Sequence, residues 1–204
     1  MYGLLLAAIG RAPEALRAAR RAHELDPLCL VVASSMAWVH YLAGDHHTAI
    51  EQCGMTLEME QGFLPARRVM AAALQQSGHP VEATMELEKA LSYTPDDPVA
   101  LAWLANARAA AGNQKAASAT AAQVRAYSGS RQLSAYHLAL AELGAGDPDA
   151  ALTALERATD DRDPSLANVA AEPRFETLHG EPRFAQLLSR LNLNLNTNTN
   201  LNTN

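Results

Sequence analysis

The chain has 204 residues, of which 49% are hydrophobic but only 5% aromatic, and its formal net charge is -6. This length allows a sizeable apolar interior, and the Ala-rich, aromatic-poor composition favours thin helical layers over a thick globular core. The acidic balance argues against a nucleic-acid groove, which needs clustered Lys and Arg. No apolar run approaches the ~18 residues of a membrane span.

The two cysteines and the apolar residues near the N-terminus indicate the cellular compartment. Cys29 and Cys53 are isolated, which does not suggest a disulfide framework, so we expect a reducing cytoplasm. Cys53 falls on a core-facing position and is predicted to be a buried free thiol. The apolar run from Gly3 to Ile9 lacks the basic start and small-residue cleavage site of a secretory signal, so we interpret it as a helix.

A fixed spacing of glycines organises most of the chain. Five glycines follow one another at steps of 34 residues: Gly10, Gly44, Gly78, Gly112 and Gly146. Five residues after each stands an alanine: Ala15, Ala49, Ala83, Ala117 and Ala151. Glycine after a helix adopts the left-handed conformation that a β-carbon disfavours, and small facing residues let two antiparallel helices approach closely. The pattern therefore predicts five helix pairs that stack to bury a continuous core.

The first pair, residues 1–29, is truncated. In register with the other units, Met1 stands at repeat position 6, so the opening turn of the first helix is missing. An incomplete first layer leaves an apolar face uncovered where such arrays carry a polar cap. Either another repeat or domain precedes Met1, which we favour, or this face docks against a partner or a second copy.

The next four units follow without insertion, at residues 30–63, 64–97, 98–131 and 132–165. In the clearest of them two amphipathic helices are separated at Gly78-His79-Pro80, and Pro80 suits the first turn of a helix. The residues after three turn glycines favour helix N-caps: Asp45, Asn113 and Asp147. We expect the most flexible junction at residues 127–130.

The pattern changes after Pro164. A further helix is predicted to begin over Leu166 to Ala171, and the sequence Glu-Pro-Arg-Phe then occurs twice, at 172–175 and 181–184. Because Pro can start a helix, residues 166–190 are predicted to form capping helices over the open end of the array. Residues 191–204 form a low-complexity tail in which Asn192 to Asn204 alternates Asn with Leu or Thr, and we expect disorder there.

These features resemble the tetratricopeptide repeat (TPR) family. The 34-residue period, the large-small pair before each turn, the alanine after it and the terminal Pro27 and Pro95 all match. Departures are the missing aromatic near the start of the first helix and the missing terminal proline in three units. The resemblance implies an all-α fold, a right-handed α-solenoid with five repeats in residues 1–165 and C-terminal capping helices. The ending also resembles the TPR regions of large bacterial regulators.

No catalytic constellation stands out, so we predict that the chain is not an enzyme and needs no cofactor. Gly144-Ala-Gly146 lacks the downstream Lys of a phosphate-binding loop. The best metal candidate is Asp45-His46-His47, but adjacent histidines on a helix point about 100° apart and rarely share an ion. We therefore predict no metal site.

The resemblance implies that the first helix of each pair lines a concave groove, where repeat positions 2, 5, 9 and 12 touch ligand. Seven residues near these positions are predicted to contact a peptide or partner protein: Ser34, Trp38, Tyr41, Arg68, Gln75, Asn106 and Tyr136. Exposed Trp, Tyr and Arg are common binding anchors. The alternative is that Trp38 and Tyr136 only pack between repeats, and Trp103 is predicted to belong to the core.

The positions of the family's two-carboxylate clamp mostly carry other residues here, among them Ala72 and Val99, so a chaperone-tail peptide is not expected. The predicted function is a non-catalytic protein-protein interaction scaffold in the cytoplasm, and the regulatory module of a bacterial signalling or transcription regulator. The alternative is a structural unit that forms a homodimer through the uncapped N-terminal repeat. Neither nucleic acid nor membrane is expected as a partner.

Overall fold

The computed structural model describes residues 2–128 and 133–193, and all the regular elements in these ranges are helical. The paired helices are α1 (Tyr2–Ala8), α2 (Ala12–Leu25), α3 (Leu30–Leu42), α4 (His46–Met59), α5 (Leu64–Gln76), α6 (Pro80–Tyr93), α7 (Pro98–Ala110), α8 (Gln114–Arg125), α9 (Ala135–Ala145) and α10 (Pro148–Asp160). Two 3-10 helices, η1 (Pro164–Asn168) and η2 (Pro173–Leu178), precede α11 (Pro182–Arg190). The predicted all-α solenoid is confirmed. The junction at 129–132 and the tail from 194 onward lie outside the described residues.

The periodic glycines end the first helix of each pair in the predicted conformation. All five have positive φ, between 78° and 83°. The next residue then donates its backbone N–H to the turn before, as from Asn113 to the Arg108 carbonyl at 2.9 Å. The side chain of Asn113 caps the following helix by accepting from the Ala116 N–H at 3.2 Å, and Asp147 does the same for Ala150 at 2.9 Å. One short segment therefore both stops a helix and starts its antiparallel partner.

Small residues set the distance between helices. The five alanines that follow the turn glycines are all fully buried. Helices α7 and α9 approach closely at Gly144, where an added β-carbon would lie 2.6 Å from the carbonyl carbon of Ala105. Most large apolar side chains fill the space between layers in one cluster that runs from α3 to α11, while Leu6, Met36 and Val39 belong to a second cluster at the N-terminal end.

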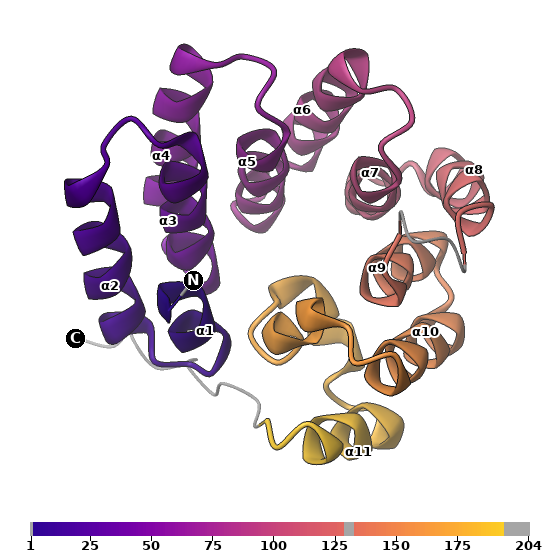
Figure 1. Ribbon diagram of the computed structural model, residues 1–204. Helices are drawn as coiled ribbons and strands as arrows, with labels where there is room; N and C mark the ends of the chain where they lie inside the picture. Colours follow the sequence, from indigo (N-terminus) through magenta and orange to yellow (C-terminus); the bar gives the residue numbers. More distant parts are fainter. Residues whose placement is uncertain (1, 129–132, 194–204) are drawn as a thin grey trace.

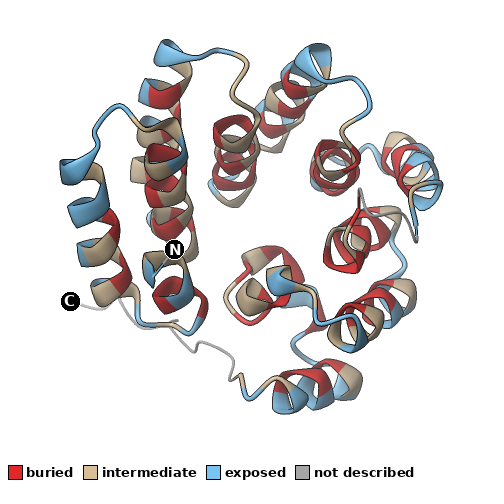
Figure 2. Cartoon of the chain, viewed as in Figure 1, coloured by how far each residue is buried: buried red, intermediate tan, exposed pale blue. Residues whose placement is uncertain are grey.

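The helix pairs follow an arc in Figure 1, with α5, α7 and α9 nearer its centre than α6, α8 and α10. Figure 2 shows that residues are buried on the sides of these helices that face their neighbours, while the outer sides of α6, α8 and α10 are largely exposed. Residues 164–178, which we name the inner segment, lie inside the arc (orange in Figure 1). The chain thus turns back into the concave side of its own solenoid.

The inner segment differs from the predicted capping helices. The helix expected over Leu166 to Ala171 is a 3-10 turn that ends at Asn168, and a second 3-10 turn begins at Pro173, because proline disfavours helical backbone in the residue before it. Among the described residues, α11 is the α-helix that covers the end of the solenoid. It lies against α10 and is fixed by ion pairs from Arg183 to Glu156 and from Arg190 to Asp160, both at 2.8 Å.

The first repeat is incomplete in the way its register predicts. Helix α1 has 7 residues where α3 has 13, and α2 is left partly uncovered. Ala22 is exposed, whereas the equivalent residues of the other four repeats are buried: Thr56, Ala90, Val124 and Ala158. A cavity of about 420 Å³ opens there, lined by the start of α1, the C-terminal half of α2 and residues 31–39 of α3.

Candidate partner-binding site

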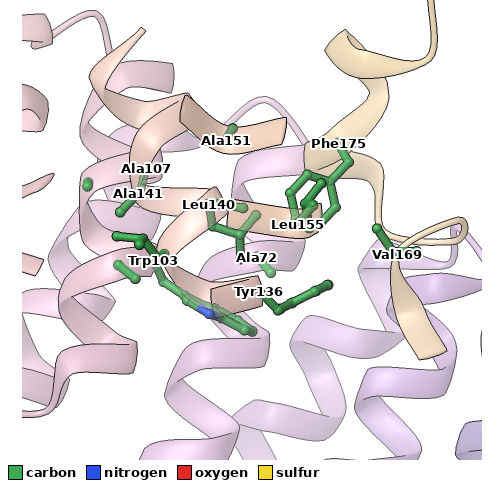
Figure 3. Packing of buried hydrophobic residues seen from close by; sticks show 14 of the residues in the cluster. Ala72, Trp103, Ala107, Tyr136, Leu140, Ala141, Ala151, Leu155, Val169 and Phe175 are labelled. Carbon is green, nitrogen blue, oxygen red and sulfur yellow. The ribbon is translucent and has the colours of Figure 1, made fainter. Parts of the chain in front are cut away.

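Four aromatic side chains extend from the inner helices of the solenoid. Trp38 and Tyr41 stand three residues apart on one face of α3, with ring centroids 4.9 Å apart. Trp103 of α7 lies 5.9 Å from Trp38, and Tyr136 follows on α9. All four belong to, or pack against, the main buried cluster, and Figure 3 shows Trp103 and Tyr136 as members of it.

The inner segment contacts each of these four aromatic residues. The Tyr41 hydroxyl donates to Glu172 Oε1 at 2.5 Å, and the Arg174 guanidinium carbon lies 3.8 Å from the centre of the Trp103 ring. Phe175 meets Tyr136 edge to face with a centroid distance of 5.2 Å. Trp38 Nε1 donates to Asn168 Oδ1 over a long 3.5 Å. The two contacts with α3 join residues more than 100 positions apart in the sequence. The inner segment therefore covers the concave side of the helices at this point.

A buried ion pair lies at the centre of these contacts. Arg174 donates from Nε and Nη2 to the two oxygens of Glu172, at 2.8 and 2.9 Å, and the two side chains are at most 1% exposed. Burial by itself raises the pKa of Glu172, but the Arg174 charge and the hydrogen bonds outweigh it and hold that pKa below the usual value. Burial, together with the charge of Glu172, raises the pKa of Tyr41 and keeps its hydroxyl a donor.

A pocket remains open beside the inner segment. It has a volume of about 250 Å³ and is lined by Trp38, Pro65, Arg68, Val69, Val99, Trp103 and His137. We name it the Arg68 pocket. Helices α3, α5, α7 and α9 all contribute, so its shape depends on three successive repeat interfaces. Since the same two indoles also contact Asn168 and Arg174, the inner segment holds the walls of the pocket in place.

The guanidinium of Arg68 forms a long ion pair with Asp97 in this pocket. The Arg68 side chain is 22% exposed, and Nη1 lies 3.8 Å from Asp97 Oδ2, beyond hydrogen-bond length. The other oxygen of Asp97 is used to cap α7, accepting from the Val99 N–H at 2.8 Å. Burial lowers the pKa of Arg68 despite the nearby carboxylate. Burial, with the Arg68 and Arg174 charges, lowers the pKa of His137 to about 4, so its imidazole is neutral at pH 7.

The structure places the seven predicted contact residues in three settings. Trp38 and Arg68 line the Arg68 pocket, and Tyr41 and Tyr136 are buried against the inner segment. The other three bond within the solenoid: Gln75 Nε2 donates to Asn106 Oδ1 at 2.9 Å, Asn106 Nδ2 donates to the Leu140 carbonyl at 3.4 Å, and the Ser34 hydroxyl donates to the Val31 carbonyl at 3.2 Å. Their contact with a partner stays a prediction.

Sequence reasoning assigned Trp103 to the core and did not select His137, Glu172 or Arg174. Trp103 is indeed buried, at 7% exposure, yet one side of it lines the Arg68 pocket. The only sequence signal for the ion pair was the duplicated Glu-Pro-Arg-Phe. That motif does not distinguish the buried copy from the surface copy at 181–184, where Arg183 bonds Glu156 instead.

The N-terminal end presents a second candidate surface. Large apolar side chains are exposed on α1, α2 and the start of α3, including Tyr2 at 67%, Leu25 at 71% and Val31 at 62%. They surround the 420 Å³ cavity, whose lining is mainly apolar apart from Arg21 and Ser35. A contiguous exposed apolar patch of this kind marks an interaction site more often than scattered surface residues do.

Within residues 2–128 and 133–193, no group of three or more His, Cys, Asp or Glu side chains is arranged to hold a metal ion. In the same ranges, every helix is too short or too polar to cross a membrane.

Comparisons with known proteins agree with the repeat architecture. A tetratricopeptide repeat family model matches residues 132–157, which span the start of α9 to most of α10. This match, together with the repeat architecture, supports a tetratricopeptide repeat family for the chain. The fold is similar to that of a thermophilic TPR protein from Thermus thermophilus, with a TM-score of 0.63, 20% identity, and coverage of 86% of this chain and 96% of that one.

A second similar fold is that of MamA residues 41 to the end from Desulfovibrio magneticus RS-1. The TM-score is 0.51 at 17% identity, and the alignment covers 76% of this chain and 88% of that one. At these identities the likeness concerns the fold alone. None of the curated proteins compared with this sequence matches it. TPR proteins are in general scaffolds for protein interactions, which is the functional class that the fold indicates.

Proposed function

We propose that this TPR protein is a non-catalytic scaffold that binds a peptide or partner protein at its concave side, anchored in the Arg68 pocket. The observation that carries the proposal is the convergence of Trp38, Arg68 and Trp103 on one open cavity of about 250 Å³. Trp and Arg are enriched among the residues that dominate binding energy, and they act best in well-packed, desolvated pockets. The cavity is smaller than the ~300–1,000 Å³ of most ligand pockets, so it suits one anchoring side chain.

The chemistry of the pocket defines what the anchor should offer. An apolar or aromatic side chain would pack against the exposed edges of the two indoles, which provide large contact area at little conformational cost. Arg68 would donate hydrogen bonds to acceptors of the partner, because Asp97 is too distant to satisfy them. The neutral His137 adds no charge that would repel a cation or attract an anion at pH 7.

A random peptide display library selected on the intact protein tests this proposal. Peptides recovered on the wild type should lose binding to Trp38→Ala and to Arg68→Gln, each by about tenfold or more, as expected for truncation of an anchor. Met85→Ala is the matched control, since Met85 is exposed on the outer helix α6 and should leave binding unchanged. Peptides that bind all three variants equally would show that the pocket is not the site.

The exposed apolar end favours a second candidate function, self-association through the N-terminal repeat. Two copies that brought their α1 and α2 surfaces together would cover Tyr2, Leu5 and Leu25 from water. Sedimentation velocity on the wild type and on the Leu5→Glu, Leu25→Glu double variant distinguishes the cases. A dimer that the double variant dissolves supports this function, and a wild type that stays monomeric at high micromolar concentration contradicts it.

We also infer from the sequence resemblance that the scaffold acts in the cytoplasm as the regulatory module of a bacterial signalling or transcription regulator. The support is the likeness of its C-terminal ending to the TPR regions of such proteins. Immunoprecipitation from native cells followed by intact mass measurement tests it. A mass well above 21.8 kDa would support a module within a larger protein, and a mass equal to that value would contradict it.

A further inference from the structure

The inner segment has features that stability alone does not require. If the inner segment served only to fill the concave side, it could be apolar throughout, since replacing a buried ion pair by well-packed apolar residues is often neutral or stabilising. Instead the segment buries Glu172 and Arg174 and matches each to a polar or aromatic group of the solenoid. Specific pairing of this kind is what a binding site uses to recognise a ligand.

The groups contributed by the segment form a short linear pattern. Glu172 accepts from Tyr41, Arg174 stacks on Trp103 two residues later, and Phe175 packs on Tyr136 immediately after. These three solenoid residues come from α3, α7 and α9, so helices from three different repeats contact the pattern. Figure 3 shows Phe175 within the buried cluster that also contains Tyr136 and Leu155.

The segment does not satisfy every polar group that it covers. Trp103 Nε1 and the Tyr136 hydroxyl are buried and have no hydrogen-bond partner among the described residues. A buried donor left unpaired loses the free energy of its hydrogen bonds with water. A ligand that kept the three recognised groups and added acceptors at these two positions would therefore bind better than the inner segment does.

The ends of the segment are fixed independently of its middle. Helix α11 is held against the fifth repeat by its buried Phe184, Leu187 and Leu188, and Arg183 and Arg190 add partly exposed ion pairs to α10. The chain between Asp161 and Glu181 can therefore leave the concave side as a loop while both ends stay in place. Loop opening of this sort exposes apolar residues such as Phe175, which a ligand that took its place would cover again.

We propose that the inner segment is an intramolecular ligand, and that the partner is a peptide with a carboxylate, a guanidinium two residues later and an aromatic ring next, which displaces it. This rests on the proposed function, because it names the partner of the same concave side. The fraction of molecules with the segment released would set the apparent affinity for that peptide. The protein would thus be a scaffold whose own C-terminal region competes with its partner.

The two copies of Glu-Pro-Arg-Phe provide a matched pair of variants in the full-length chain. Arg174→Ala leaves Glu172 buried without its cation, which should expel the segment. Arg183→Ala removes partly exposed ion pairs outside the concave side, while the buried Phe184 and Leu187 still hold α11 in place. The probe is a fluorescent peptide of residues 168–178, NVAAEPRFETL. We expect it to bind Arg174→Ala at least about tenfold more tightly than the wild type, and Arg183→Ala within about twofold of the wild type.

Hydrogen exchange of the wild type tests the inference without any variant. Amides of residues 164–178 should exchange faster than those of α9 and α10, and Arg174→Ala should accelerate them further. The inference is overturned if these amides exchange only with global unfolding, or if folded Arg174→Ala binds the probe no better than the wild type. If Arg174→Ala does not fold, the isosteric Glu172→Gln takes its place. Selected peptides that still need Trp38 and Arg68 would then leave the proposed scaffold function intact.

Discussion

The contact between α7 and α9 leaves no room for a methyl group, which makes Gly144→Ala a sharp test of the packing. The added β-carbon would lie 2.6 Å from the carbonyl carbon and oxygen of Ala105 and 2.7 Å from the Asn106 nitrogen. All three are backbone atoms, so relief requires a shift of one helix. Overpacking of this kind costs about 1–3 kcal/mol, against which alanine gains about 1 kcal/mol of helix propensity. Because the clash is with backbone atoms, we expect a cost toward the upper end of this range and a net loss of up to about 2 kcal/mol in the free energy of unfolding.

Gly54→Ala is the control that measures the gain in helix propensity without a steric clash. Gly54 lies inside α4, and a β-carbon there would meet nothing within 4 Å. The substitution should therefore stabilise the protein by about 0.5–1 kcal/mol. Urea denaturation followed by circular dichroism measures both, and the thermal midpoint should move by about 2–4 °C for each kcal/mol. If Gly144→Ala were as stabilising as Gly54→Ala, the close approach of α7 and α9 would be wrong.

Three further predictions follow from single groups. Asp147→Ala removes the cap of α10 and should destabilise the protein by about 1 kcal/mol in urea denaturation, while no loss would contradict the cap. Because the pKa of His137 is lowered to about 4 in the folded state, the unfolded state takes up its proton first, so stability should fall as the pH drops from 6.5 toward 4. His137→Asn should flatten that decline, and an unchanged pH profile would contradict the burial of the ring. Burial raises the pKa of the Cys53 thiol to about 12, so iodoacetamide should alkylate Cys53 only after unfolding, later than the half-buried Cys29.

The sequence predicts the solenoid well because its determinants are local. A glycine such as Gly112 is needed where the backbone adopts positive φ, and Asn113 caps the next helix through a residue only three positions away. Burial of Ala83 and its equivalents follows from the repeat period, since five units must share one packing geometry. Even the exposed Ala22 follows from the missing turn of the first helix.

The concave side could not be predicted in the same way. Repeat positions indicate which side chains of α3, α5, α7 and α9 face inward, but not what lies against them. The contact of Tyr41 with Glu172 joins residues 131 positions apart, and no periodicity relates the two. Both halves of the inner segment are 3-10 turns in place of the predicted helix, and their course depends on contacts with residues far away in the sequence.

A double-mutant cycle on Tyr41 and Glu172 tests most directly whether the C-terminal region occupies the concave side. Tyr41→Phe and Glu172→Gln are nearly isosteric. Glu172→Gln also removes the charge opposite Arg174, but this loss occurs with either residue at position 41, so the cycle isolates the contact between the two side chains. The free energies of unfolding of the two single variants and the double variant should show a coupling of about 1.5–3 kcal/mol, the range for a hydrogen bond to a charged group. Single-variant effects that add within about 0.5 kcal/mol would mean that residue 172 does not meet Tyr41 in solution.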